Sequence, residues 1–187
     1  MKRLPTLILL GLLSAPLLAA DTYTIDPNHT LPVFEVSHLG FSTQRGRFDR
    51  TSGKITLDRE KKSGRVDLII EADSIDMGQT KWNEHMKSAD FFNAARFPII
   101  TYTSDKLIFE GDIPVAAEGA LTLLGVEKPV KIAIKRFTCG INPIAKKPLC
   151  AADIEAALTR SDFGMTSYLP AVGDEVKVMV PVEAFKD

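Results

Sequence analysis

The residues that could carry out chemistry in this chain are few and widely spaced. Only three histidines occur, His29, His38 and His85, and no two of them have the i, i+2 or i, i+4 spacing of a metal site. The chain has no Gly-x-Ser-x-Gly motif and no glycine-rich phosphate loop before a predicted helix. The sequence therefore predicts no catalytic residue, no metal ligand and no required cofactor.

The two cysteines, Cys139 and Cys150, are the only thiols of the chain. Residues 140–149 between them contain no His, Asp or Glu that could complete a metal site. In an oxidising compartment such a pair forms a disulfide. We expect a Cys139–Cys150 disulfide, which would contribute about 2–3 kcal/mol in the chain-entropy model.

The N-terminus has the layout of a secretory signal peptide. Met1-Lys2-Arg3 is positively charged, residues 4–18 carry no charge, and the small pair Ala19-Ala20 follows. Prolines and a glycine interrupt the apolar run, which is shorter than the roughly 20 residues of a membrane-spanning helix. We therefore expect residues 1–20 to be cleaved on export to the periplasm, and residues 21–187 to form one domain.

The charge of the chain gives no sign of a nucleic-acid partner. The sequence has 23 basic and 24 acidic residues, a formal net charge of −1, and loss of Lys2 and Arg3 would leave the remainder more acidic. Basic and acidic residues are interspersed along the chain. Because no basic patch of the kind that binds phosphates is visible, we expect no binding of DNA or RNA.

Most of the chain after residue 20 alternates apolar and polar residues, the pattern of strands with one buried face. In residues 128–137, for example, Val130, Ile132 and Ile134 share one face. The frequent turn residues between such runs favour an antiparallel barrel or sandwich. The expected strands are residues 22–25, 33–39, 44–50, 54–58, 66–71, 99–109, 116–123, 128–137, 153–161 and 174–185.

One segment, residues 79–92, breaks the strand pattern. Trp82, Met86 and Ala89 have helical spacing, and the stretch lacks glycine and proline. A short helix followed by Phe91-Phe92 would lay an aromatic flap on the sheet. The flap is either a plug that fills one end of the core or a moving lid.

A barrel of about eight strands would be wide enough inside for one elongated ligand. His38 shares a strand face with Phe34 and Val36, so it is either a core histidine bonded to backbone or a polar anchor of a cavity. The aromatic and apolar residues either line that cavity or fill a solid core. The candidate lining residues are Phe34, Val36, His38, Phe41, Phe48, Trp82, Phe91, Phe92, Phe97 and Tyr102.

Several segments resemble the YceI family of secreted, lipocalin-like barrels. The resemblance spans nearly the whole chain after the signal peptide, in order. The segments that carry it are residues 23–30 (YTIDPNHT), 34–41 (FEVSHLGF), 45–49 (RGRFD), 52–53 (SG), 87–92 (KSADFF), 97–102 (FPIITY), 121–130 (LTLLGVEKPV) and 161–165 (SDFGM).

The resemblance implies an all-β fold, an extended eight-stranded antiparallel barrel with a short helix after about the fifth strand. It further implies a long apolar tunnel that holds a polyisoprenoid, an isoprenoid-quinone tail such as that of ubiquinone, or an amphiphilic fatty compound. The expected role is a non-catalytic carrier or store of lipid, with a link to envelope stress. The partners left open are a transient membrane contact for lipid exchange and a homodimer.

Two other functions compete with this interpretation. The first is a small secreted hydrolase with an unfamiliar site of His, Asp and Ser, since triad members need not be neighbours in sequence. The second is a structural envelope protein with a solid core. A cavity too small for an alkyl chain would favour the structural protein.

Overall fold

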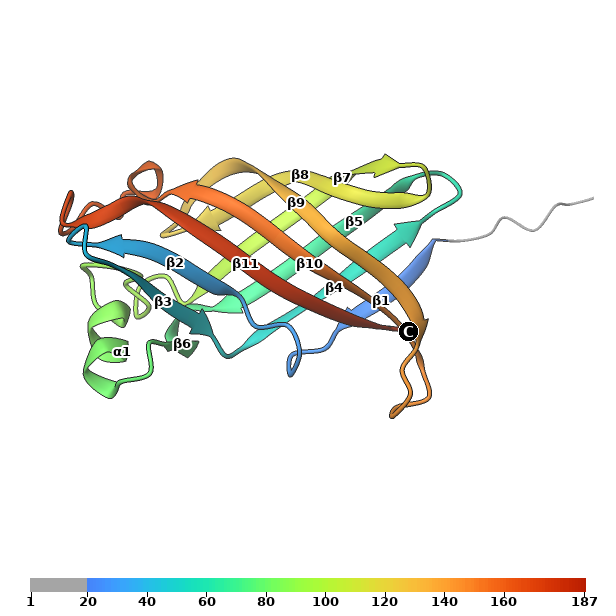
Figure 1. The fold of residues 1–187 in the computed structure, drawn as a ribbon, viewed down its shortest axis with the longest axis horizontal. Helices are drawn as coiled ribbons and strands as arrows, with labels where there is room; N and C mark the ends of the chain where they lie inside the picture. Colours follow the sequence, from blue (N-terminus) through green and yellow to red (C-terminus); the bar gives the residue numbers. More distant parts are fainter. Residues whose placement is uncertain (1–19) are drawn as a thin grey trace, which may run out of the picture.

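The structure, a computed structural model, describes residues 20–187. The predicted signal peptide, residues 1–20, lies outside the described residues except for Ala20. In the described part of the chain, no helix is long and apolar enough to cross a membrane. Figure 1 shows an elongated barrel of long, tilted strands, with a short α-helix against one end.

Eleven strands form one continuous antiparallel sheet. The elements are β1 (Asp21–Ile25), β2 (Val33–His38), β3 (Ser42–Phe48), β4 (Thr51–Asp58), β5 (Ser63–Glu71), the 3-10 turn η1 (Ala72–Ser74), β6 (Ile75–Asp76), α1 (Thr80–Lys87), β7 (Ile99–Glu110), β8 (Ile113–Leu123), β9 (Val126–Ile141), β10 (Pro148–Thr159), the 3-10 turn η2 (Arg160–Phe163) and β11 (Val172–Lys186).

The eleven strands close into an eight-stranded barrel, because three of the eight barrel strands are bent and each is divided into two shorter strands. These three are β1 with β2, β3 with β4, and β5 with β6. The first barrel strand, made of β1 and β2, closes the ring. β1 pairs with β4 and with the last residues of β11, whereas β2 pairs with β3 and with the first half of β11. The predicted eight-stranded antiparallel barrel is confirmed.

Alternating side chains explain why these strands bury one face. Along β11, Val176, Val178, Val180 and Val182 face the barrel interior, whereas Lys177 between them is exposed. β9 and β10 are long enough to cross the barrel and extend beyond it (Figure 1). At their outer end Cys139 lies directly opposite Cys150, and the two form the predicted disulfide.

Helix α1 is shorter than the predicted segment 79–92, because the helix ends at Lys87 and the chain turns at Ser88. The helix is held against β6 by Asn83, whose side-chain amide donates to Asp76 at 3.2 Å and whose side-chain oxygen accepts the Met77 N–H at 2.7 Å. After the turn, Phe91 and Phe92 are 7% and 9% exposed and belong to the core cluster at this end of the barrel. The predicted aromatic flap therefore forms, with its rings turned inward.

Close packing of β3 against this cluster requires a glycine. A Cβ atom on Gly46 would lie 2.5 Å from Cζ of Phe34. Phe34 in turn packs against Phe48 and Phe92, with ring centroids 6.1 Å apart in both pairs. Gly46 thus lets the three phenylalanines meet where the bent barrel strands converge.

Candidate ligand-binding tunnel

Two adjoining cavities lie inside the barrel. The first, of about 160 Å³, occupies the half that contains the disulfide, and the second, of about 120 Å³, occupies the half covered by α1. Each volume is on the order of ten times the space that one water molecule needs. Five residues line both cavities, so the two lie end to end inside the barrel, and we call them together the hollow. They are Pro32, Ile70, Leu121, Leu158 and Val178.

The wall of this hollow is apolar almost throughout. The second cavity has no polar surface and the first has almost none. Aliphatic side chains from β5, β8, β9, β10 and β11 supply most of the lining, and phenylalanines gather at the α1 end. Such a wall suits a long hydrocarbon chain, and it offers no group that would bind a charged or strongly polar ligand.

Tyr102 on β7 contributes a phenol ring to the first cavity but keeps its hydroxyl occupied. The hydroxyl donates to the Val130 carbonyl at 3.2 Å and approaches the Ala117 carbonyl at 3.4 Å. Burial raises the pKa of Tyr102 to about 12. The ring therefore presents an apolar face to the hollow at any ordinary pH.

The α1 end of the hollow is shaped by a buried arginine. Arg160 in η2 is 4% exposed, and its guanidinium donates to the carbonyls of Met165, Ser167, Val172 and Gly173 at 2.8–2.9 Å. Burial lowers its pKa, which the neighbouring Asp174 partly offsets. Because the second cavity has no polar surface, Arg160 contributes only its aliphatic stem to the wall.

A carboxylate fixes the same loop from its other side. Asp174 accepts the Ser161 N–H at 2.9 Å and the Ser161 hydroxyl at 2.7 Å. These hydrogen bonds lower the pKa of the Asp174 carboxyl. Together, Arg160 and Asp174 hold residues 160–174 in one shape, and with them Phe163 and Met165, which line the second cavity.

The mouth at this end is covered by contacts between α1 and the loop before β11. The Tyr168 hydroxyl donates to the Asp90 carboxylate at 3.0 Å. Nε2 of His85 lies 3.3 Å from that hydroxyl and 3.3 Å from the same carboxylate. The hydrogen bond to Asp90 raises the pKa of Tyr168. Beneath them Phe91 stacks on Tyr168 and lines the second cavity. These residues form a cover made of exposed, non-covalent contacts, which local motion can open.

The structure brings six of the ten predicted lining residues to the hollow. Phe34, Val36, Phe48, Phe91 and Phe92 line the second cavity, and Tyr102 lines the first. Their contact with a lipid stays a prediction. Sequence reasoning missed most of the aliphatic wall and Arg160, whose partners are backbone carbonyls that leave no signature in the sequence.

The other four predicted residues lie away from the cavity lining. Phe41 is 92% exposed in the β2–β3 turn, and Trp82 is 39% exposed on α1. His38 lies at the end of β2, paired with Ser42 and Val172, and Phe97 lies under the guanidinium of Arg96. A role of His38 as the polar anchor of a headgroup stays a prediction.

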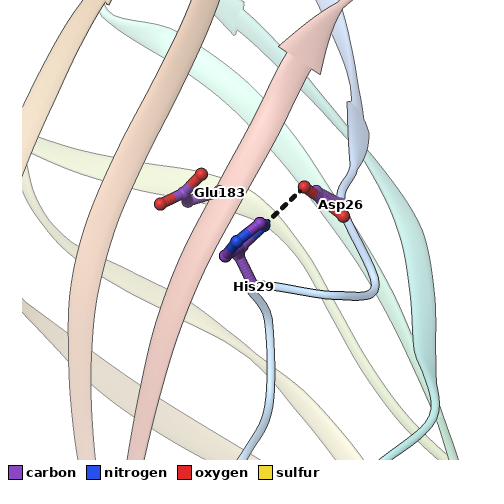
Figure 2. Close-up of side chains that lie close together, drawn as sticks. All are labelled: Asp26, His29 and Glu183. Atoms are coloured by element: carbon purple, nitrogen blue, oxygen red, sulfur yellow. Dashed lines mark hydrogen bonds and ion pairs between the residues drawn. The ribbon is translucent and has the colours of Figure 1, made fainter. Parts of the chain in front are cut away.

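A second histidine cluster stabilises the bend between β1 and β2. Figure 2 shows Asp26, His29 and Glu183. One carboxylate oxygen of each acidic residue and one ring nitrogen of His29, the atoms that could bind a metal ion, lie within 4.8 Å of one another. Asp26 accepts hydrogen bonds from His29 Nδ1 at 2.8 Å and from the Asn28 N–H at 2.9 Å. Partial burial alone would raise the pKa of Asp26, but these two hydrogen bonds outweigh burial and lower it. The hydrogen bond between Asp26 and His29 also raises the pKa of His29.

This cluster is tied to β11 through the backbone. The Asp26 N–H donates to the Glu183 carbonyl at 2.8 Å, and the Glu183 N–H donates to the hydroxyl of the fully buried Thr30 at 3.1 Å. Across residues 20–187, neither of the hydrogen-bonded pairs His29–Asp26 and His85–Asp90 has a serine or cysteine on its imidazole. The arrangement holds a bend in the chain.

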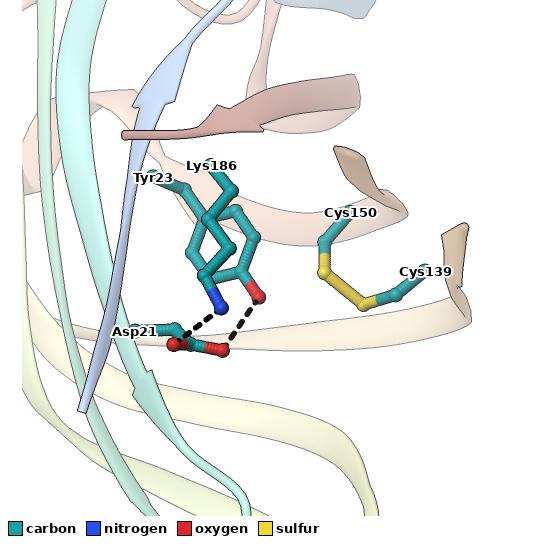
Figure 3. Close-up of a disulfide and its surroundings, with 5 residues drawn as sticks. All are labelled: Asp21, Tyr23, Cys139, Cys150 and Lys186. Atoms are coloured by element: carbon teal, nitrogen blue, oxygen red, sulfur yellow. Dashed lines mark hydrogen bonds and ion pairs between the residues drawn. A yellow bond between two sulfur atoms is a disulfide. The ribbon is translucent and has the colours of Figure 1, made fainter. Parts of the chain in front are cut away.

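The disulfide end of the hollow is closed by a different set of contacts. Figure 3 shows Tyr23 beside the Cys139–Cys150 bridge, with Asp21 paired to Lys186 at 2.6 Å. Cys150 is 8% exposed, and both it and Tyr23 line the first cavity. Burial, followed by the charge of Asp21, raises the pKa of Tyr23. The disulfide therefore joins the tunnel wall to the hairpin that projects beyond it.

Comparison with known proteins places this geometry among related chains. Residues 23–184 match the family model of the YceI-like domain. The protein YceI of Salmonella arizonae is 34% identical over 167 residues, which cover 88% of this chain and 86% of that protein.

Two solved structures have the same fold. BcnA of Burkholderia cenocepacia superposes with a TM-score of 0.73 at 20% identity, over 85% of this chain and 98% of that one. A polyisoprenoid binding domain from Saccharophagus degradans superposes with a TM-score of 0.66 at 18% identity, over 88% of this chain and 98% of that one. The elongated barrel is thus shared by chains whose sequences have diverged widely.

Proposed function

The chain belongs to the YceI family, and from that premise we propose that it is a periplasmic carrier or store that holds the chain of a polyisoprenoid or isoprenoid quinone inside its barrel. The observation that carries the proposal is the pair of adjoining apolar cavities that make up the hollow. Binding to a hydrocarbon chain needs no catalytic group, and the proposed role is not enzymatic. The name of the Saccharophagus relative, a polyisoprenoid binding domain, supports the same ligand class.

The physical need for such a host is large. Each CH₂ group removed from water contributes about 0.8 kcal/mol, and a polyisoprenoid carries tens of carbons. A free chain of this kind therefore stays in a membrane and does not cross an aqueous compartment in useful amounts. A closed barrel can enclose the chain because its own backbone hydrogen bonds are satisfied around the ring.

The lining of the hollow also limits how the ligand is recognised. Neither cavity offers a polar partner for a headgroup, so the headgroup must lie at a mouth of the barrel. We therefore propose that affinity depends mainly on the length of the apolar chain. Carriage between membranes and storage during envelope stress both fit a tunnel that is covered by contacts between exposed residues.

The test is to identify what the protein holds when it is purified gently from its own host. Native mass spectrometry should show an added mass, and extraction should identify a polyisoprenoid or an isoprenoid quinone. The delipidated protein should then retain ubiquinone and a polyprenol of equal chain length with similar affinity, and should bind short-chain ubiquinone weakly.

The proposal fails if the protein is purified empty and retains neither added ubiquinone nor added polyprenol. It is also overturned if affinity follows the headgroup and is independent of chain length, since a chain-lined tunnel cannot produce that result. A matched control is the same protein incubated with a water-soluble quinone that lacks a tail, which should not be retained.

A further inference from the structure

The segment that joins β9 to β10 is exposed and carries apolar side chains at its surface. We call residues 141–148, from Ile141 to Pro148, the hairpin tip. Ile141 and Ile144 are 64% and 91% exposed, and Lys146 and Lys147 are also exposed. Figure 1 shows this loop projecting beyond the body of the barrel beside the C-terminus. Two isoleucines exposed on one short loop leave apolar surface in water, and burial of that surface against a partner would be favourable.

The hairpin tip has a fixed shape. The Asn142 side-chain oxygen accepts the N–H groups of Ile144 and Ala145 at 2.9 and 2.8 Å. The Asn142 N–H donates to the Lys147 carbonyl at 2.8 Å, and the Lys146 N–H donates to the Asn142 carbonyl at 2.9 Å. The Cys139–Cys150 disulfide closes the base of this loop. Ile144 is thus held outward by the loop itself, so a partner would meet a preorganised surface.

The charge of this region has one sign. From residue 136 to residue 152 the side chains include Arg136, Lys146 and Lys147 and no acidic group, whereas the chain as a whole has a formal net charge of −1. Two of the carboxylates that approach from neighbouring strands have cationic partners, and a third, Glu183 opposite Ala151, lies near His29. Asp21 pairs with Lys186 (Figure 3), and Asp187 pairs with Lys54 at 2.8 Å. The hairpin tip is therefore a locally cationic, apolar projection.

We propose that the hairpin tip docks onto an anionic lipid bilayer. Ile141 and Ile144 would enter the headgroup region, and Lys146 and Lys147 would pair with lipid phosphates. A lipid surface suits this combination because it offers negative charge and a shallow apolar layer at the same place. A protein partner would have to supply both features in a pocket shaped for Ile144.

Docking through the hairpin tip would bring one end of the tunnel to the membrane. Phe137, Cys150 and Ala151, at the base of the same hairpin, line the first cavity. A membrane-bound hairpin tip would therefore hold the barrel at the bilayer while its lipid chain is exchanged. This purpose rests on the proposed function, whereas the docking itself rests only on the surface.

The opposite end of the barrel also exposes apolar residues and serves as the comparison. Phe41 and Leu39, in the β2–β3 turn, are 92% and 54% exposed. β11 pairs with His38 at Val172 and with Cys150 at Ala184, so the two ends are about 40 Å apart. On the β2–β3 hairpin, Arg45 is paired with Glu35 at 2.6 Å. That end lacks the cationic excess of the hairpin tip.

The experiment is co-sedimentation of the exported protein with phosphatidylcholine vesicles, with and without phosphatidylglycerol. We expect binding only to the vesicles that contain phosphatidylglycerol, weakening as salt is raised. Replacing both lysines, Lys146→Gln with Lys147→Gln, should weaken binding about 25-fold, about fivefold for each charge. Ile144→Asn should weaken it about tenfold.

Two controls keep the result specific. Lys61→Gln with Lys62→Gln removes the same number of charges from adjacent exposed lysines in the β4–β5 turn and should have little effect. Phe41→Ser alters the opposite end and should have none. All these positions are exposed, so thermal unfolding should show that each variant keeps the fold.

The proposal is overturned by equal binding to neutral vesicles, by no binding to either kind, or by loss of binding in Phe41→Ser with the hairpin tip variants intact. It is also overturned if Ile144→Asn dissociates a dimer, because the hairpin tip would then be an interface between copies. Retention of a polyisoprenoid is measured separately on the same samples. A protein that retains lipid without docking refutes only the docking, and one that docks without retaining lipid refutes only the proposed function.

Discussion

The ring of Tyr168 stacks on the ring of Phe91, with centroids 5.7 Å apart and planes 13° from parallel. Phe91 lines the second cavity, whereas Tyr168 is 50% exposed, so the pair spans from the tunnel to the solvent. The Tyr168 hydroxyl also donates to Asp90 in the turn after α1. The cover at this end thus depends on one residue that makes both a stacking contact and a hydrogen bond.

Replacing Tyr168 by alanine should speed lipid exchange. The change removes the stacking contact and the hydrogen bond, so the cover should open more often, and transfer of a fluorescent polyisoprenoid to acceptor vesicles should accelerate about tenfold. Tyr168→Phe keeps the stack and should accelerate transfer only about twofold. Unchanged transfer in Tyr168→Ala would mean that lipid leaves by the other end of the barrel.

Replacing Arg160 by methionine should destabilise the barrel by about 3 kcal/mol. Methionine fills a similar volume but leaves four carbonyls, which the guanidinium now satisfies, without a donor in a buried loop. Urea denaturation measures the loss. The matched control is Arg96→Met, because Arg96 is exposed and lies over the Phe97 ring, and its loss should cost less than about 1 kcal/mol. Equal losses in both variants would contradict the structural role of Arg160.

Tyr102 should make the folded state sensitive to alkaline pH. Its folded pKa is raised to about 12 from an unfolded value near 10, so folding favours the neutral phenol. The stability that Tyr102 contributes is therefore complete below pH about 10 and is lost as pH rises toward about 12. The loss amounts to about 2–3 kcal/mol.

The measurement for Tyr102 is the difference in unfolding free energy between the native protein and Tyr102→Phe. Other groups also titrate at alkaline pH, but they do so in both proteins and cancel in the difference. That difference should be constant at neutral pH and should shift in favour of Tyr102→Phe above pH about 10. A difference that does not change with pH would show that Tyr102 ionises freely in the folded state.

The barrel itself could be predicted because it follows from a pattern of period two. The valines of β11 and the face made by Val130, Ile132 and Ile134 alternate with polar residues, and each of these apolar side chains lines the hollow. The bends that divide three of the barrel strands were not predictable in this way. The bend between β1 and β2 depends on Asp26, His29 and Thr30 meeting Glu183, a partner more than 150 positions later.

The site was less predictable than the fold, for reasons that individual residues show. The pattern along β2 continues to Leu39, but Leu39 and Gly40 have φ of 55° and 72°, and this turn carries Phe41 out into solvent. Trp82 and Met86 share helix α1, yet only Met86 lines the cavity, whereas Trp82 is 39% exposed. Arg160 binds backbone carbonyls, which every sequence has.

The two cavities should act as one tunnel, and Val178 is the residue at which to test this. Val178 lines both cavities, and Val178→Phe places a ring at their junction. A long polyprenol would then lose the part of its chain that lies beyond the ring, and at about 0.8 kcal/mol per CH₂ its affinity should fall on the order of 100-fold. A short isoprenoid that fits one cavity should bind as before.

Val182→Phe makes the same substitution on the same strand in the first cavity alone, so it should leave the passage open and weaken long chains much less. Titration of the delipidated proteins with fluorescent isoprenoids of two lengths separates these outcomes. Equal affinity of Val178→Phe and the native protein for the long chain would show that the ligand does not pass through the junction.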